Sequence, residues 1–431
     1  MIGVTKYFKS SLIQNTFFSL INKGINAFVP LFFIPLCSNL FGIEAFGRMI
    51  FYQSLVGLLI TFSDYGFSVT GLKAASLNSN NPIAISKLFS EISFIKVSLL
   101  LLGSISLYIY ISSTDSELAN TNELLLFLFV LGSLSLQSLL PYWLFQGLRK
   151  NKIVAIINLI SKLLLILLTV LFVLKSKFIF SVALVELISY VFALSICLVL
   201  LYKKYKIKLQ FPKVNAMKNQ LYVGFNVFII VLIYWAINGG SILFVEKNVT
   251  AFELGFYGIF LRFSYYTFAI FQPIILSFIP FFTEKFNESF SAGINYFKKI
   301  FLYYTVSVFV LLFILGLLLK SIVEVTFSNE IILFFRSNQL IPYSLLFWIF
   351  LILINSFTAN TVLLSANKES TYRNAQLLNG ISVLSLFFIF IPKYGALGAG
   401  FSMVFGELLF ALYIFPNSYK FIFSNKNKIN V

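Results

Sequence analysis

The stretch FSLINKGINAFVPLFFIPL, residues 18–36, is apolar and long enough to cross a membrane, yet it carries a lysine near its start. A membrane-spanning helix needs about 20 mainly apolar residues. Lys23 stands three residues before Asn26, a spacing that places both side chains on one face of a helix. Because a charge is costly in hydrocarbon, such residues usually face the interior of a helix bundle. The stretch therefore predicts a helical membrane protein with a polar interior.

The composition of the whole chain is that of a membrane protein. Of the 431 residues, 59% are hydrophobic and 11% are charged, whereas about a quarter of the residues in a soluble protein are charged. Two cysteines are too few for a disulfide framework, and the lack of histidine argues against a zinc or haem centre. No small-residue cleavage site follows the first apolar run, so we expect a retained helix and not a secretory signal.

Twelve apolar runs are long enough to span a bilayer. They cover residues 12–37, 46–71, 85–111, 123–147, 153–174, 178–201, 219–245, 255–282, 298–319, 339–365, 374–391 and 396–416. Two connections are longer than the others, one after the sixth run and one after the ninth. The second, SIVEVTFSNEIILFFRSNQ, is amphipathic enough to lie along the membrane interface. We therefore expect an all-α integral membrane protein with twelve transmembrane helices.

The net charge of +17 is explained by membrane topology. If the N-terminus is cytoplasmic, 21 of the 32 basic residues fall on the cytoplasmic side, 7 fall on the other side, and 4 lie inside spans. Basic residues concentrate on the cytoplasmic side of membrane proteins. The distribution predicts that both termini are cytoplasmic, and it argues against nucleic acid as a partner.

A weak internal repeat divides the chain into two halves. A shift of 221 residues matches Lys152 with Arg373, Asn158 with Asn379, Ser161 with Ser382, Ser181 with Ser402 and Glu186 with Glu407. Polar matches at one offset are informative in a sequence dominated by leucine. We expect two pseudo-symmetric six-helix bundles, residues 1–208 and 209–431. Transporters built from parallel repeats bind their substrate between the halves.

Four cations inside spans are candidates for binding an anionic substrate: Lys23, Lys162, Arg262 and Lys96. Lys162 shares a helical face with Asn158, as Lys23 does with Asn26. The guanidinium of Arg262 suits phosphate, because it presents a fixed fork of donors and keeps its charge. Lys96 has no evident polar stripe on its own helix. Together these groups would attract an anion such as a pyrophosphate into a wet cavity with apolar walls.

Three carboxylates are candidates for coupling transport to an ion: Glu186, Glu407 and Asp64. Asp64 ends a face of polar and small residues that also contains Gln53, Gly57 and Thr61. Each of these charges has an alternative, purely structural interpretation. The lysines could pair with the carboxylates to hold helices together, and Asp64 could anchor loops at the inner end of its span.

Several segments resemble the O-antigen flippases, the Wzx-type polysaccharide transporters of the multidrug/oligosaccharidyl-lipid/polysaccharide exporter superfamily. The similar segments are NLFGIEAFGRMIFYQS, SDYGFSVTGLK, PYWLFQGLRKNKIVAIIN, FELGFYGIF and IPKYGALGAGFSMVFGELL. The resemblance implies two six-helix bundles that form a V around a central cavity.

The resemblance also implies an activity in lipopolysaccharide biosynthesis. An undecaprenyl-pyrophosphate-linked oligosaccharide would be turned from the inner to the outer leaflet of a bacterial inner membrane by alternating access. Lys23, Lys162 and Arg262 would meet the pyrophosphate, and Glu186 and Glu407 would respond to H⁺ or Na⁺ as the coupling ion. No other cofactor is implied. A glycan polymerase and a chain-length regulator would be partners besides the bilayer itself.

Two other functions are compatible with a protein of this span count. A cation or drug antiporter of the same superfamily would want acidic residues to dominate its cavity, whereas here the embedded cations at least equal the acids. A membrane-embedded glycan polymerase would carry a large outer loop, and no connection here exceeds about twenty residues. The residues favour the flippase.

Overall fold

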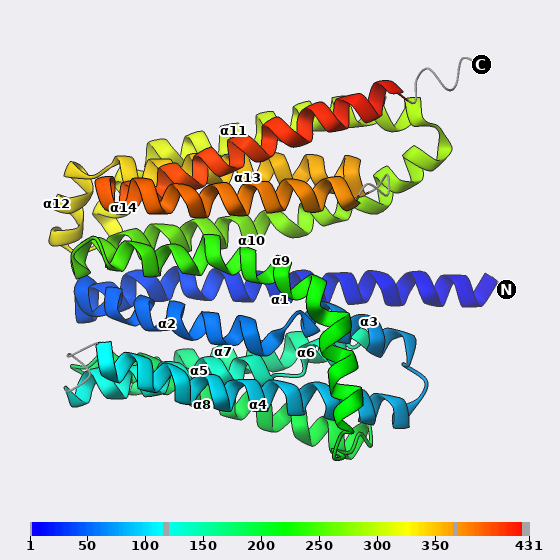
Figure 1. Cartoon of the computed structure of the whole chain (residues 1–431), viewed down its shortest axis with the longest axis horizontal. Helices are drawn as coiled ribbons and strands as arrows, with labels where there is room; N and C mark the ends of the chain where they lie inside the picture. The colour runs from blue at the N-terminus through cyan, green and yellow to red at the C-terminus, as the bar shows by residue number, and fades with distance from the viewer. Residues whose placement is uncertain (1, 115–119, 365–368, 425–431) are drawn as a thin grey trace. The chain divides into compact units, whose positions relative to one another are not determined.

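The computed structural model describes residues 2–114, 120–364 and 369–424, and these segments form helices joined by short connections (Figure 1). The helices of the first half are α1 (Ile2–Phe41), α2 (Ile43–Asp64), α3 (Phe67–Leu77), α4 (Pro82–Thr114), α5 (Thr121–Leu139), α6 (Tyr142–Gly147), α7 (Asn151–Leu171) and α8 (Phe180–Val199). A short 3-10 turn at Val173–Lys175 follows α7, and a π-helical turn at Leu200–Lys204 follows α8. The expected all-α class is confirmed.

The second half is built in the same way from longer helices. These are α9 (Val214–Glu246), α10 (Ala251–Glu288), α11 (Phe290–Thr326), α12 (Asn329–Ser337), α13 (Leu340–Thr358) and α14 (Glu369–Ser424), with a π-helical turn at Ala359–Leu364 after α13. The segment expected to be amphipathic contains α12, a short helix that buries Ile331 and Phe335 on one side. Its exposed Arg336 donates to Glu324 Oε1 over 2.8 Å.

Among the described residues, eleven helices are long and apolar enough to cross a membrane. The sequence predicts twelve, and the difference lies in α14, whose candidate span Ser370–Pro416 has 47 residues. The backbone leaves the helical conformation at Gly395 (φ 55°, ψ −135°), so α14 consists of two helices. They correspond to the predicted runs 374–391 and 396–416. The chain is a multi-pass membrane protein with the expected set of spans.

The turn at Gly395 brings together two of the sequence motifs. The backbone N–H of Ala396, at the start of the second helix of α14, donates to Glu253 Oε1 over 3.0 Å. A Cβ atom at position 395 would lie 2.6 Å from the same oxygen. Glycine is required here because φ is positive and because the Glu253 carboxylate approaches closely. FELGFYGIF and IPKYGALGAGF are therefore in direct contact.

Two predicted spans of the first half are broken near one end. The second span breaks between α2 and α3, where Tyr65 has φ 46° and Gly66 has φ 78°. A Cβ atom at Gly66 would lie 2.7 Å from Val227 Cγ1, so glycine serves both the turn and the packing. The fourth span breaks between α5 and α6 at Leu140 and Pro141. Backbone groups freed at such breaks need new partners.

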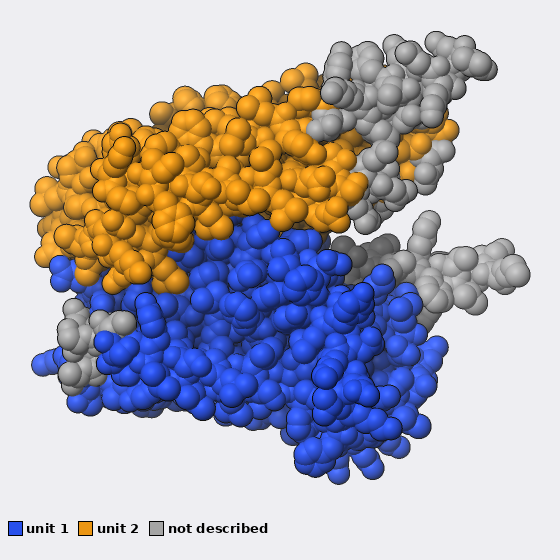
Figure 2. Space-filling view, in the orientation of Figure 1, with its two compact units in different colours: residues 1–30, 40–240 blue, residues 31–39, 241–431 orange. Residues whose placement is uncertain are grey.

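The chain divides into two compact units (Figure 2). Unit 1 contains residues 1–30 and 40–240, and unit 2 contains residues 31–39 and 241–431. The chain passes from one unit to the other inside the helices α1 and α9. Lys368, Lys426 and Lys428, which are counted on the cytoplasmic side in the topology prediction, lie outside the described residues.

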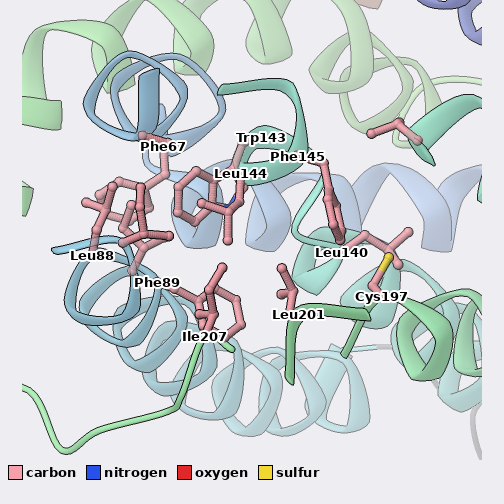
Figure 3. Close-up of a cluster of buried hydrophobic side chains, with 14 of the residues drawn as sticks. Phe67, Leu88, Phe89, Leu140, Trp143, Leu144, Phe145, Cys197, Leu201 and Ile207 are labelled. Atoms are coloured by element: carbon pink, nitrogen blue, oxygen red, sulfur yellow. The ribbon is translucent and has the colours of Figure 1, made fainter. Parts of the chain in front are cut away.

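Each unit has an apolar core. In unit 1, buried side chains from α3, α4, α6 and α8 pack with Leu201 and Ile207 of the following connection (Figure 3). The free thiol of Cys197 is buried in this cluster. In unit 2, Phe357 stacks on Tyr304 with ring centroids 4.3 Å apart, and Phe282 and Phe297 lie around it. Aromatic pairs add specific contacts to the burial of area.

Candidate functional site

Three asparagines join α1 to α7 inside unit 1. The Asn158 side chain, which is 5% exposed, donates from Nδ2 to Asn22 Oδ1 over 2.7 Å and to Asn26 Oδ1 over 3.0 Å. Amide side chains buried in a membrane protein are used for hydrogen bonds between helices. This asparagine cluster fixes the faces that α1 and α7 turn toward each other.

The asparagine cluster carries a lysine on each of its two helices. Lys23 directly follows Asn22 on α1, and Lys162 lies one helical turn after Asn158 on α7. Both lysines are partly buried. Two cationic side chains on adjacent helices therefore flank one set of interlocked amides, all within candidate membrane spans.

Lys162 and Glu186 line the same small cavity between α7 and α8. Its other lining residues are Ser161, Leu165, Ser189 and Tyr190. The Lys162 ammonium lies 5.6 Å from the centroid of the Tyr190 ring, and Ser161 Oγ donates to the Ser189 carbonyl over 3.1 Å. A cation over an aromatic face is stabilised by the ring quadrupole. The cavity thus combines a cation, a carboxylate and polar groups in the interior of the unit.

Glu407 forms a second polar cluster, in unit 2. Its Oε1 accepts from Asn379 Nδ2 over 2.8 Å and its Oε2 accepts from Asn355 Nδ2 over 2.7 Å. The three residues are 8%, 4% and 2% exposed in the order Glu407, Asn379, Asn355. Both carboxylate oxygens thus accept neutral amide donors from neighbouring helices, which lowers the cost of burying the group. We call these residues the carboxylate cluster.

Lys96 and Asp64 pair with each other. Lys96 Nζ lies 2.7 Å from Asp64 Oδ1 and donates to the Ser138 carbonyl over 3.0 Å. Asp64 is the last residue of α2, and Ser138 stands next to the end of α5. Lys96 therefore supplies a donor at the C-terminal ends of α2 and α5, where the two spans break and backbone carbonyls lack helical partners. The geometry is that of a structural clamp.

The remaining candidates lie elsewhere in their units. Gln53 is partly buried on α2 in unit 1. Arg262 is partly buried on α10 in unit 2, one turn before Tyr265, whose ring meets Trp348 edge-to-face at 6.0 Å. The structure thus gathers Asn26, Asn158, Lys23, Lys162 and Glu186 along α1, α7 and α8, whereas Glu407 belongs to a separate cluster.

Sequence reasoning missed several of the polar partners. Asn355 lies in an almost wholly apolar run, and Tyr190 and Ser189 follow Glu186 by less than one and a half turns. Asn379 enters the sequence analysis only as a repeat match to Asn158. A lone amide inside an apolar run is itself a signal, because an amide in hydrocarbon needs a hydrogen-bond partner.

Comparison with solved structures shows which fold the chain adopts. An inward-facing multidrug resistance MATE family transporter of the MOP superfamily matches with a TM-score of 0.70 at 12% identity, over 96% of each chain. Lipid II flippase MurJ in an inward closed conformation matches with a TM-score of 0.60 at 15% identity, over 95% of this chain and 86% of that one. The fold is the helical membrane fold of these transporters.

Sequence comparison shows the family. The chain belongs to the polysaccharide biosynthesis protein family, whose model matches residues 12–286. A "Putative O-antigen transporter" of Escherichia coli (strain K12) is 28% identical over 170 residues, 38% of this chain and 39% of that protein. A protein of the same name from Shigella dysenteriae is 30% identical over 152 residues, 34% and 36% of the two chains. The matches span about two fifths of these relatives, and the family resemblance of the motifs is confirmed.

Proposed function

We propose that this protein flips an undecaprenyl-pyrophosphate-linked oligosaccharide from the inner to the outer leaflet of the bacterial inner membrane. The oligosaccharide would be the repeat unit of O-antigen or a similar surface glycan. Both chain termini would be cytoplasmic, as the distribution of basic residues predicts. The family and the names of the curated relatives support a role in surface polysaccharide export.

One observation carries the proposal. In unit 1 the hydrogen bonds from Asn158 to Asn22 and Asn26 place Lys23 and Lys162 on two helices that are held side by side. Lysine inside a membrane span is costly and marks a binding site or pathway more often than a lipid-facing surface. Two such lysines can neutralise the two phosphates of a pyrophosphate. We propose Arg262, on α10, as a further cation that contacts the anionic substrate.

The carboxylates would couple flipping to an ion. A carboxylate that is buried in one state and hydrated in another changes its affinity for H⁺ between those states. Glu407 is buried and accepts from the neutral amides of Asn355 and Asn379, and Glu186 shares its cavity with Lys162. We propose alternating access in which H⁺ or Na⁺ binds at one or both carboxylates. A glycan polymerase and a chain-length regulator would act on the exported unit.

The proposal is tested in a cell that lacks this gene and in vesicles. The deletion strain is expected to accumulate lipid-linked oligosaccharide on the inner leaflet and to lose surface glycan. Complementation with Lys23→Ala or Arg262→Ala should leave the protein in the membrane but impair export, and Lys175→Ala, an exposed lysine of a loop, is the matched control. Normal glycan display by both variants and by their double variant, at equal protein levels, would show that these cations do not bind the substrate.

A cation or drug antiporter is the second candidate. The carboxylate cluster and the fold of a multidrug transporter favour it. An antiporter would extrude lipophilic cations, so ethidium efflux from cells that express the protein separates the two functions. We expect no efflux above that of cells without it, because the lysines of unit 1 would repel a cation.

A further inference from the structure

The connection between α8 and α9 is attached firmly to unit 1. Leu201 and Ile207 are 1% and 4% exposed within the core cluster (Figure 3). Tyr205 packs edge-to-face on Phe145 with ring centroids 6.0 Å apart. At the start of α9, Gln220 Nε2 donates to Glu91 Oε2 over 2.9 Å. We call residues 202–218 the basic segment.

Two serines of α4 hold the extended part of the basic segment. The backbone N–H of Lys208 donates to Ser86 Oγ over 3.2 Å, and that of Gln210 donates to Ser90 Oγ over 2.9 Å. Four residues of a helix rise about 6 Å, and two residues of an extended chain span about 6.6 Å. The two spacings match, so the segment lies along α4 in a fixed register, as a built surface.

The outer side of the basic segment combines positive charge with exposed apolar groups. The exposed cations are Lys203, Lys204, Lys206, Lys208, Lys213 and Lys218. Tyr202 directly precedes these lysines, and Leu209, Phe211 and Val214 stand between them; the four residues are 65%, 62%, 92% and 66% exposed. Within the described part of the chain, the ion pairs join Arg48 to Glu123, Lys96 to Asp64, Lys285 to Glu288 and Arg336 to Glu324, and none of them uses these lysines. Phe211 keeps this exposure although its ring centroid lies 5.5 Å from that of Phe94 on α4, and a partner with both apolar and anionic parts fits this face.

The chain keeps this face at the bilayer surface. Candidate spans Phe180–Lys204 and Val214–Glu246 include the two ends of the basic segment, and only residues 205–213 lie between the spans. In Figure 1 the first turns of α9 run across the direction of α2 and α5, as a helix in the interface plane would. Lysines beside a membrane span are attracted to anionic headgroups, and aromatic rings prefer the interface.

We propose that the basic segment binds anionic phospholipid headgroups, with Lys203, Lys204, Lys206 and Lys208 at the phosphates and Phe211 inserted among the acyl chains. The ligand is the phospholipid of the surrounding membrane and not the transported glycan lipid. This inference stands apart from the proposed function, because it uses neither the lysines nor the carboxylates of the spans. It predicts a fixed shell of anionic lipid on one face of unit 1.

The experiment counts lipids retained by the purified full-length protein. Delipidated protein in detergent is mixed with phosphatidylglycerol or phosphatidylcholine, and bound lipids are counted by native mass spectrometry. We expect the variant in which Lys203, Lys204, Lys206 and Lys208 are all changed to Gln to bind phosphatidylglycerol at least about tenfold more weakly, with phosphatidylcholine binding unchanged. The control changes Lys175, Lys177, Lys247 and Lys320 to Gln, four exposed lysines elsewhere, so that the net charge is the same.

The outcomes distinguish binding at the basic segment from a general effect of the protein's positive charge. Equal loss in the variant and in the control would overturn the proposal, as would equal loss of phosphatidylcholine. Because the attraction is screened within about 10 Å at 0.1 M salt, raising the salt concentration should release phosphatidylglycerol from the wild-type protein. Retention that does not respond to salt would overturn the proposal independently of any variant. Equal binding of phosphatidylglycerol and phosphatidylcholine by the wild-type protein would do the same.

Discussion

The two units use matched residues in different ways. At the 221-residue offset, Asn158 and Glu186 of unit 1 correspond to Asn379 and Glu407 of unit 2. Asn379 donates directly to Glu407, whereas Asn158 donates to two asparagines of α1. Position 162 is lysine, and its counterpart at position 383 is valine. The repeat thus keeps the amide and the carboxylate, and the surroundings decide what each can do.

This difference suggests that the two units bind different ligands. The unit 1 cluster has cations beside amides and suits an anionic headgroup. The carboxylate cluster of unit 2 has neutral donors around one carboxylate and suits a small cation or a proton. The Glu407 carboxylate accepts from neutral amides, whereas Glu186 shares its cavity with the Lys162 ammonium.

The largest effect is expected when unit 1 is made to resemble unit 2. Lys162→Val reproduces the residue at position 383 and removes one of the two cations beside the asparagine cluster. Loss of a charged contact inside a binding site costs about 2–5 kcal/mol, so glycan export should fall at least about tenfold. Export is measured as surface glycan per membrane-inserted protein. Leu163→Val on the lipid-exposed side of α7 is the control, and wild-type export by Lys162→Val would remove the cation from the mechanism.

Substitutions at Glu407 test whether the carboxylate cluster binds the coupling ion. Glu407→Leu leaves the amide donor of Asn379 without its acceptor, which costs about 1–3 kcal/mol, whereas Asn355 Nδ2 keeps its bond to the backbone carbonyl of residue 407. Glu407→Gln keeps an acceptor and the shape, so it should stay folded and lose the dependence of flipping on the ion gradient. Thermal unfolding and flipping in vesicles with and without a gradient give the two readouts. Gradient-dependent flipping by Glu407→Gln would show that coupling resides elsewhere.

The clamp of Lys96 and Asp64 should contribute to stability and not to transport. Lys96→Met leaves the Asp64 carboxylate and the Ser138 carbonyl without this donor, and we expect a loss of about 1–3 kcal/mol in the free energy of unfolding. The double variant Lys96→Met/Asp64→Leu should recover part of that loss, because no unpaired carboxylate remains. Both variants should transport normally per folded molecule. A transport defect in the stable double variant would indicate that Lys96 binds the substrate.

The spans could be predicted from the sequence because length and hydropathy set them directly. Residues 374–391 and 396–416 are separate helices, as predicted, even though the backbone between them nearly continues. The contacts between helices could not be predicted, since they depend on how each helix is rotated about its axis. Lys96 shows the problem: its own helix has no polar stripe, and its partners stand on α2 and α5. Asn355 is a second example, because its apolar run gives no sign that the amide donates to Glu407.

The smallest effect is expected where the repeat itself is tested. If the 221-residue match reflects two related halves, Glu186→Cys and Glu407→Cys should lie at the same depth in the membrane, within about one helical turn or 5 Å. Spin labels at the two positions report depth through their accessibility to oxygen and to a water-soluble nickel complex. The native Cys37 and Cys197 are 2% and 0% exposed and are changed to Ala in this background, and Leu163→Cys reports a lipid-exposed site. Depths that differ by several turns would mean that the matched carboxylates are unrelated, and the contrast between the units would then reflect two sites of separate origin.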